Sequence, residues 1–347
     1  MKKAWTVGAL VALAAVVASV LAASGLARTD APAAKHARHA TLKVGLVTDI
    51  GGLNDRSFNH LAFVGLTKAH NQLGVDMRVL TSTQNSDYIP NLSALAQQGY
   101  DLVIGVGFLM HDAIRTVAAK FPNTKFMIID DAWASGDPTN LEGTVFHEEQ
   151  AGYLVGYLSG LVVKSNIGLK KGKNVVSTVG GQKIPPVDHY IAGFQAGAKA
   201  ADKGVKTLNA YSQDFVAQDK CKNLALNQIG SGSRVVFQVA GGCGLGALDA
   251  AKTKKVWGVG VDADQAYLGP YILSSAVKRV DTDVFTTVNQ LQKGTFKPAR
   301  TFEFTVKNGG IDIGKISKKV PKKYVAQIAV IKKKIAKGQI KIPNTVK

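Results

Sequence analysis

The chain has 347 residues and a formal net charge of +19 at neutral pH. Beyond the N-terminal region its length suffices for two domains of ordinary size, and no later stretch is long and apolar enough to cross a membrane. The segment Lys315–Lys347 contains eleven lysines and no acidic residue. Aromatic residues do not alternate with these lysines, which argues against a nucleic-acid partner. We expect the segment to contact an anionic membrane or cell-wall polymer, or to serve solubility alone.

The N-terminus has the pattern of an export signal. Two lysines precede the apolar stretch Ala4–Ala23, and small residues follow it, with Gly25–Ala27 as a plausible cleavage site. We therefore expect residues 1–27 to be a signal peptide and residues 28–41 a flexible tether. An uncleaved membrane anchor is the alternative, because the apolar stretch is long enough to span a bilayer. Either way, the protein is expected to work outside the cytoplasm.

The rest of the chain alternates between strand-like and helix-like segments. Short apolar runs predict strands over residues 44–48, 77–81, 102–106, 125–130, 175–179, 206–211, 235–239 and 256–261. Helical patterns fall between them, over residues 58–73, 88–98, 111–121, 148–163, 190–201, 219–229 and 245–254. Strands that alternate with helices form right-handed βαβ units and parallel sheets.

The alternation is interrupted at Lys164–Lys173, a polar segment with turn character. The long apolar helix predicted just before it, over Glu148–Val163, could carry the chain from one domain to another. A single sheet of eight strands is possible, but two doubly wound sheets that face each other across a cleft explain the arrangement better. The predicted fold class is therefore α/β, with two parallel-sheet lobes.

Polar residues gather directly after the first predicted strand, in the segment Asp49–Asn59 with the sequence DIGGLNDRSFN. Ligands of α/β sheets bind at this carboxyl edge of the strands. The segment offers two carboxylates, two amides, a hydroxyl and an aromatic ring, on Asp49, Asp55, Asn54, Asn59, Ser57 and Phe58. It lacks the lysine and glycine spacing of a phosphate-binding loop. The alternative is that these are turn residues and that Phe58 belongs to the core.

Two more predicted strands end in aspartate, at Asp130 and Asp262. Asp131 follows Asp130, but adjacent strand residues point in opposite directions, so only one of the two can face a cleft. This geometry disfavours a glycosidase-type carboxylate pair. Three strand-terminal aspartates, including Asp49, are hard to attribute to turns alone. Ionised acceptors make strong hydrogen bonds to hydroxyl groups, so the pattern favours a ribose or another sugar.

The segment Gly242–Gly246, between a predicted strand and a predicted helix, imitates a dinucleotide-binding fingerprint. Its late position in a domain and the export signal disfavour a nicotinamide cofactor, and we expect a loop whose backbone N–H groups approach an uncharged ligand. The seven histidines lack metal-ligand spacing. There is no G-x-S-x-G elbow and no Cys–His pair typical of a nucleophile. We expect no cofactor, metal or catalytic residue.

These motifs occur in the order seen in one family. Further segments of the same kind are FHEEQAGYLVG at 146–156, FQVAGGCGLG at 237–246, GVGVDADQ at 258–265 and SSAVK at 274–278. The chain resembles the basic membrane protein family, substrate-binding proteins of ABC transporters that include purine nucleoside receptor lipoproteins. The resemblance implies a type I periplasmic-binding-protein fold with three crossovers. Lobe 1 would comprise residues 42–148 and 272–297, and lobe 2 residues 149–271 and 298–347.

The resemblance also implies a ligand site between the lobes. Phe58 and Phe237 would stack on the two faces of a purine base, Asp262 and Lys278 would contact the ribose or the base edge, and Gly242 would give a backbone contact. The full expected set is Asp49, Asn54, Phe58, Asn59, Asp130, Phe237, Gly242, Asp262 and Lys278.

The implied function is capture of a nucleoside by a monomer that delivers it to an ABC permease. Ser24 stands where the family carries its lipid-bearing cysteine, so lipid attachment there is impossible. An enzyme is the main alternative, namely a nucleoside or glycoside hydrolase that uses the strand-terminal aspartates. A sensory module that presents the nucleoside to a signalling partner is a third reading.

The two cysteines, Cys221 and Cys243, are predicted to form a disulfide, which an exported chain permits. The helix over 219–229 should begin at the carboxyl edge of its sheet, and the strand over 235–239 should return to that edge. Both cysteines would then lie on one side of the domain. Two free thiols are the alternative.

Overall fold

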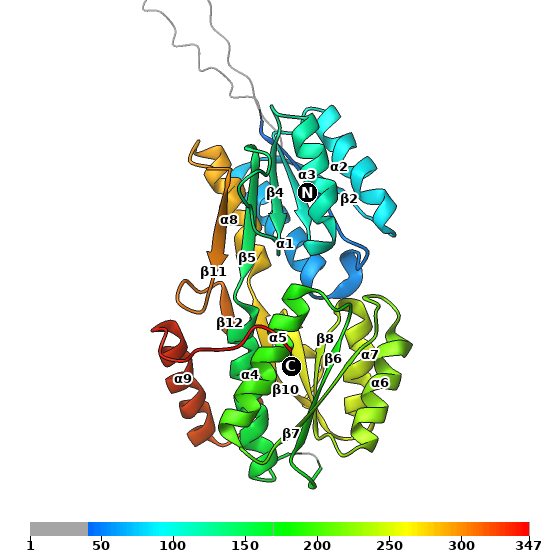
Figure 1. The fold of residues 1–347 in the computed structure, drawn as a ribbon, viewed down its shortest axis with the longest axis vertical. Coiled ribbons are helices and arrows are strands. Elements are labelled where there is room, and N and C mark those ends of the chain that lie inside the picture. Colours follow the sequence, from blue (N-terminus) through cyan, green and yellow to red (C-terminus); the bar gives the residue numbers. More distant parts are fainter. Residues whose placement is uncertain (1–40, 169, 347) are drawn as a thin grey trace, which may run out of the picture. The chain divides into compact units, whose positions relative to one another are not determined.

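The computed structural model describes residues 41–168 and 170–346 (Figure 1). The predicted signal peptide and all of the tether except residue 41 lie outside the described residues. The described chain forms two six-stranded sheets, with strand orders β11-β5-β4-β3-β1-β2 and β12-β10-β9-β8-β6-β7. We call the first sheet and its helices lobe 1, and the second sheet and its helices lobe 2.

Lobe 1 is a parallel sheet covered by helices. Its strands are β1 (Lys43–Val47), β2 (Asp76–Leu80), β3 (Leu102–Val106), β4 (Lys125–Ile129), β5 (Leu141–Phe146) and β11 (Arg300–Phe304). Its helices are α1 (Phe58–Leu73), α2 (Tyr88–Gln97), α3 (His111–Lys120) and α8 (Val280–Gln292), with the short η1 (Leu53–Asp55), η2 (Asn85–Asp87) and η3 (Phe108–Met110). β3 is buried along its whole length, because a parallel sheet in an α/β lobe is covered on both faces.

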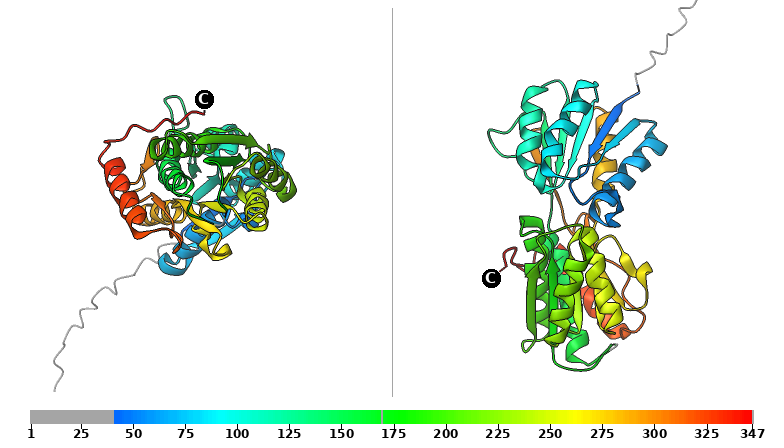
Figure 2. Two further views of the ribbon diagram at one scale, coloured as in Figure 1. Left: turned by 90° about the horizontal axis from the view of Figure 1, so that it is seen from below. Right: turned by 90° about the vertical axis from the view of Figure 1, so that its right-hand side faces the viewer.

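Lobe 2 repeats this plan. Its strands are β6 (Val175–Gly180), β7 (Lys206–Tyr211), β8 (Val235–Val239), β9 (Trp257–Asp262), β10 (Ile272–Lys278) and the antiparallel β12 (Ile311–Ile313). Its helices are α4 (Glu148–Lys164), α5 (Pro185–Ala201), α6 (Gln218–Gly230), α7 (Gly241–Thr253), α9 (Lys322–Ala336) and the short η4 (Gln265–Leu268). Helices α4 and α5 pack beside one another on one face of the sheet, and α6 and α7 on the other (Figures 1 and 2).

The α4–α5 pair is packed backbone against backbone. A Cβ atom on Gly156 of α4 would lie 2.1 Å from the carbonyl oxygen of Phe194 on α5, and one on Gly197 would lie 2.2 Å from that of Tyr153. Only glycine fits at so close an approach. The glycines that give both helices a small-residue character therefore set the distance between them.

The lobe boundaries differ from the expected ones. β10 pairs with β9 in lobe 2, whereas residues 272–297 were expected in lobe 1. β11 pairs with β5 in lobe 1, although residues 298–347 were expected in lobe 2. The chain crosses between the sheets after β5, after β10 and between β11 and β12. An apolar strand fits either of two buried sheets, so its sequence does not select one.

The eight strands and seven helices predicted from the sequence are present, with shifts at their ends. The largest shifts are at two helix starts. α5 begins at Pro185 rather than at residue 190, which suits the fixed φ angle of proline in a first turn. α7 begins at Gly241, so the Gly-rich segment expected to be a loop forms the first turns of a helix. Over residues 41–168 and 170–346, no helix has both the length and the apolar character needed to cross a membrane.

Candidate functional site

The carboxyl edges of both sheets border one cavity of about 550 Å³, including its open mouth. Lobe 1 contributes residues that follow β1, β3 and β4. Lobe 2 contributes residues from α5, the loop after β7 and the ends of β8, β9 and β10. The lining includes Asp49, Phe58, Asn59, Gly107, Asp130, Ile184, Val187, Tyr190, Phe215, Val239, Gly241, Asp262 and Lys278.

Asp49 and Asn59 orient one another at the end of β1. The Asn59 Nδ2 donates to Asp49 Oδ1 at 2.7 Å, and the Asp49 backbone N–H donates to Asn59 Oδ1 at 3.2 Å. Gly51 N–H also donates to Asp49 Oδ1, at 2.8 Å. Asp49 Oδ2 accepts no hydrogen bond within the described part of the chain, and it lies beside Gly107 and the cavity. Burial raises the pKa of Asp49 to about 6, against the lowering effect of these hydrogen bonds.

Asp55 also borders the cavity, but its carboxylate is engaged by the backbone at the start of α1. Asp55 accepts backbone N–H groups of Ser57 at 2.9 Å, Asn59 at 2.8 Å and His60 at 3.1 Å, so it satisfies the open donors at the start of α1. Asn54 is exposed and lies on an outer surface instead of the cavity. The sequence expectation that Asn54 lines the site is therefore not met in this structure.

Lys278 is the central cation of the site, with 2% of its side chain exposed. Its Nζ donates to both Asp130 oxygens, at 2.8 and 2.7 Å, and to Glu148 Oε1 at 3.2 Å. Burial alone would lower the pKa of Lys278, but the charges of Asp130 and Glu148 outweigh it and raise that pKa. Since Asp130 follows β4 and Lys278 ends β10, this ion pair joins lobe 1 to lobe 2.

Asp262 is held by a second contact between the lobes. Its Oδ2 accepts from Ser57 Oγ of lobe 1 at 2.6 Å, and its Oδ1 accepts from the Tyr190 hydroxyl at 3.1 Å. Asp130 and Asp262 occupy equivalent places, each at the end of the fourth strand of its lobe, and both have a left-handed φ, of 67° and 58°. Such backbone conformations are concentrated at functional sites.

The aromatic residues of lobe 2 that line the cavity are Tyr190 and Phe215, and Phe237 is not one of them. Phe237 has no exposed surface and packs on Phe194 and Tyr190, with ring centroids 5.1 and 6.0 Å away. The residue of β8 that reaches the cavity is Val239, two positions later on the same face. Phe215, in the loop between β7 and α6, lines the cavity together with Phe58 of lobe 1. A lone aromatic in a polar loop at the carboxyl edge is the sequence signal that could have identified it.

Within the Gly-rich segment at the start of α7, the glycine that borders the cavity is Gly241, with φ +52°, and not the expected Gly242. A Cβ atom on Gly242 would meet the Phe215 carbonyl oxygen at 3.3 Å and the Asp55 Cα at 3.8 Å. Gly242 therefore supports the Phe215 loop and lies close to lobe 1.

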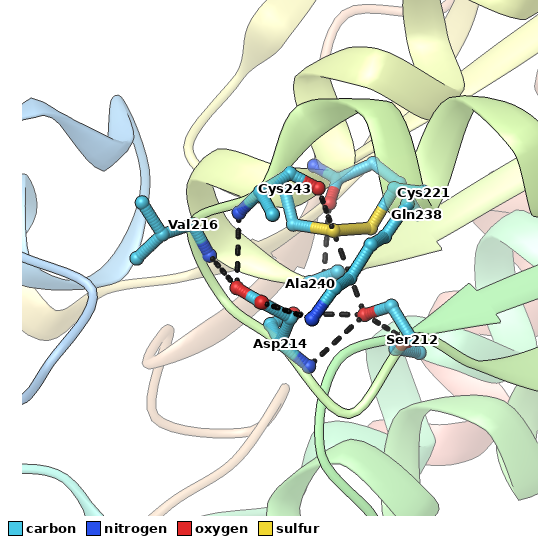
Figure 3. Close-up of a disulfide and its surroundings, with 10 residues drawn as sticks. Ser212, Asp214, Val216, Cys221, Gln238, Ala240 and Cys243 are labelled. Carbon is cyan, nitrogen blue, oxygen red and sulfur yellow. Dashed lines mark hydrogen bonds and ion pairs between the residues drawn. A yellow bond between two sulfur atoms is a disulfide. The ribbon is translucent and has the colours of Figure 1, made fainter.

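A disulfide between Cys221 and Cys243 fixes the Phe215 loop (Figure 3). It joins the starts of α6 and α7, with Cα atoms 5.6 Å apart. The Cys243 N–H donates to the Phe215 carbonyl oxygen at 2.9 Å. On the other side of the loop, Asp214 Oδ1 accepts from the N–H groups of Val216 and Ala217, at 2.8 and 2.9 Å (Figure 3). The backbone of Phe215 is thus held on both sides.

The acidic start of α4 is occupied by ion pairs. Glu148, Glu149 and His189 lie close enough together to hold a metal ion. However, Glu148 already accepts from Lys278 and pairs with His189 at 3.1 Å, and Glu149 pairs with His147 at 3.0 Å. These charges compensate one another without a metal.

The comparison with known proteins agrees with this architecture. The model of a family described as PnrA-like ABC transporter substrate-binding proteins matches residues 42–346. The chain is 32% identical to the "ABC transporter nucleoside-binding protein BmpA" of Lactococcus lactis subsp. cremoris, over 94% of this chain and 96% of the relative. It is also 32% identical to a "CD4+ T-cell-stimulating antigen" of Listeria innocua, over 96% and 97% of the two chains.

Solved structures show the same fold. A solute-binding protein of an ABC transporter system from Aeropyrum pernix K1 matches with a TM-score of 0.81 and 24% identity, over 88% of this chain and 94% of that one. Another, from Conexibacter woesei, matches with a TM-score of 0.68 and 25% identity, over 88% and 99%. Such proteins bind small molecules for delivery to permeases and are not enzymes. The two α/β lobes, the cavity between them and the family match lead to one conclusion: the chain belongs to the PnrA-like substrate-binding proteins of ABC transporters.

Proposed function

We propose that this protein captures a nucleoside, preferably a purine nucleoside, outside the cytoplasm and delivers it to an ABC permease. The observation that carries the proposal is the pair of aromatic residues, Phe58 and Phe215, which line one cavity from opposite lobes. A flat base between two rings gains roughly 1–3 kcal/mol from each stack. A relative named as a nucleoside-binding protein supports the same ligand class.

The polar part of the cavity suits ribose hydroxyls. Asp49 Oδ2 is a free acceptor within the described chain, and Asp130 and Asp262 are held in fixed positions by Lys278, Ser57 and Tyr190. Carboxylates outnumber the single cation Lys278 around this space. An additional phosphate would meet this excess negative charge, so a nucleoside fits better than a nucleotide.

Calorimetric titration tests the proposal with inosine, guanosine, uridine, ribose and inosine monophosphate. Purine nucleosides should bind most tightly, and ribose and the nucleotide should bind far more weakly. Phe215→Ala should weaken nucleoside binding roughly ten- to hundredfold, the equivalent of one lost stack. Phe237→Leu is the matched control, since it changes a core ring and should lower stability without changing affinity. Unaltered affinity in Phe215→Ala, or equal affinity for ribose and inosine, would refute the nucleoside assignment.

Delivery to a permease is tested in cells. Deletion of this gene should abolish high-affinity uptake of labelled nucleoside, and the wild-type gene should restore it. The Phe215→Ala gene should restore uptake only at raised nucleoside concentration, because its product can still deliver the ligand to the permease but binds it more weakly. Undiminished uptake in the deletion strain would contradict the transport role while leaving the binding result intact.

A further inference from the structure

The C-terminal helix α9 has one face packed on lobe 2 and one face in solvent (Figure 1). Ile328 and Ile335, two turns apart, are buried on the inner face. The Tyr324 hydroxyl shares a hydrogen bond of 2.5 Å with Ser165 Oγ at the end of α4. These contacts fix the helix to the lobe, so its outer face has a defined composition and orientation.

The outer face combines cations at both ends with an apolar centre. Lys322, Ala326, Val330 and Lys333 of α9, and Lys337 directly after it, follow at helical spacing and are all exposed. Val330 keeps 52% of its surface exposed. Lysine stems extend along an apolar surface while their ammonium groups reach polar surroundings. This face is therefore complementary to a surface with an outer layer of anionic groups and an apolar layer directly beneath them.

The charge of this region is largely uncompensated. The described part of the segment from Lys315 to Lys341 contains ten lysines and no acidic residue, and nine of the ten are exposed. Among the described residues only Lys332 forms an ion pair there, with Asp312 at 2.6 Å. A concentration of like charges favours an anionic partner.

We propose that α9 docks on the surface of an anionic lipid bilayer, with its axis in the membrane plane and Val330 at the boundary between headgroups and acyl chains. A soluble polyanion would pair with the lysines equally well but would gain nothing from an exposed valine. The cavity-lining residues of the described chain include none from α9. Docking therefore leaves the ligand site accessible.

Co-sedimentation of the full chain with vesicles tests the proposal. Vesicles of phosphatidylglycerol and phosphatidylcholine are compared with pure phosphatidylcholine, and the ratio of the two partition coefficients is the readout. Binding through the apolar N-terminal stretch would occur on both kinds of vesicle, so the ratio cancels it. Combined Lys322→Gln, Lys333→Gln and Lys337→Gln should lower the ratio roughly 100-fold, since each lysine near an anionic surface contributes about fivefold.

The matched control removes three exposed lysines elsewhere, by Lys120→Gln, Lys203→Gln and Lys293→Gln. It changes the net charge equally and should leave the ratio within a few-fold of wild type. An equal loss in both triple variants, or no preference of the wild type for anionic vesicles, would overturn the proposal. Thermal unfolding shows that each variant is folded, and nucleoside titration should be unchanged in both.

Val330→Ser separates a bilayer from a soluble polyanion. It should lower vesicle binding several-fold, because an apolar side chain no longer leaves water, and should not change binding to soluble polyphosphate. If Val330→Ser leaves vesicle binding unaltered while polyphosphate binds the wild type as tightly as vesicles do, the partner is a polyanion and the bilayer assignment fails.

Discussion

Removing the Cys221–Cys243 disulfide should destabilise lobe 2 and loosen the wall of the ligand cavity. The bond closes a loop with a sequence separation of 22 residues. Constraint of the unfolded chain by a loop of this length contributes about 3 kcal/mol in the chain-entropy model. Both cysteines are fully buried, so the suitable perturbation is Cys221→Ala combined with Cys243→Ala, which introduces no buried hydroxyl.

Urea unfolding of the empty protein, followed by circular dichroism, measures the first effect. The free energy of unfolding should fall by about 3 kcal/mol. Nucleoside titration measures the second effect, the loosening of the cavity wall. In the double variant the N–H of residue 243 still donates to the Phe215 carbonyl oxygen, but the start of α7 is no longer crosslinked to α6. Affinity should fall several-fold, and less than in Phe215→Ala. An unfolding free energy equal to that of the wild type would refute the entropic argument, and unaltered affinity would show that the disulfide does not position Phe215.

Three further changes test other parts of the structure. Gly156→Ala should lower the free energy of unfolding by about 1–3 kcal/mol, because its Cβ would lie 2.1 Å from the Phe194 carbonyl oxygen. The control Gly230→Ala has open space around its Cβ and should not destabilise the protein. Equal losses for the two variants in urea unfolding would contradict the close-packing account. Burial raises the pKa of Asp283 well above its usual value, so the folded state keeps a proton that the unfolded chain releases above about pH 4, and stability should decline as pH rises above that value. Asp283→Asn should remove this slope between pH 5 and 8, and an identical slope in both proteins would contradict it. Asp49, with a pKa raised to about 6, should lose its acceptor charge as pH falls, so nucleoside affinity should drop roughly tenfold from pH 7 to pH 5; Asp49→Asn should show a flatter profile, and pH-independent wild-type binding would remove Asp49 from the site.

Strand ends were the most predictable part of the site. Asp49, Asp130 and Asp262 follow buried strands, and parallel strands bring their carboxyl ends to one edge, so local sequence was sufficient to gather them at the cavity. Phe58 was found for the same reason. These inferences needed only the direction of each strand and no knowledge of how one lobe meets the other.

The errors arose where the outcome depended on how far a residue lies from the sheet edge, or on which strand a given strand pairs with. Phe237 and Val239 share one face of β8, and only the position of the sheet edge decides which of them reaches the cavity. Phe215 lies in a loop, where no periodicity predicts a direction. β10 belongs to lobe 2 and β11 to lobe 1, the reverse of the expectation. The lobe of each strand depends on its pairing partner, and a run of apolar residues does not specify that partner.

The late position of the last strands has a consequence for biogenesis. β11 completes the sheet of lobe 1 at β5, and β12 covers β10 in lobe 2, so both sheets receive a final strand from residues 300–313. Until this segment is synthesised, the edge strands β5 in lobe 1 and β10 in lobe 2 each lack a pairing partner on one side. Contacts between such distant segments form slowly. A chain truncated before residue 300 would therefore leave one edge of each sheet open to aggregation.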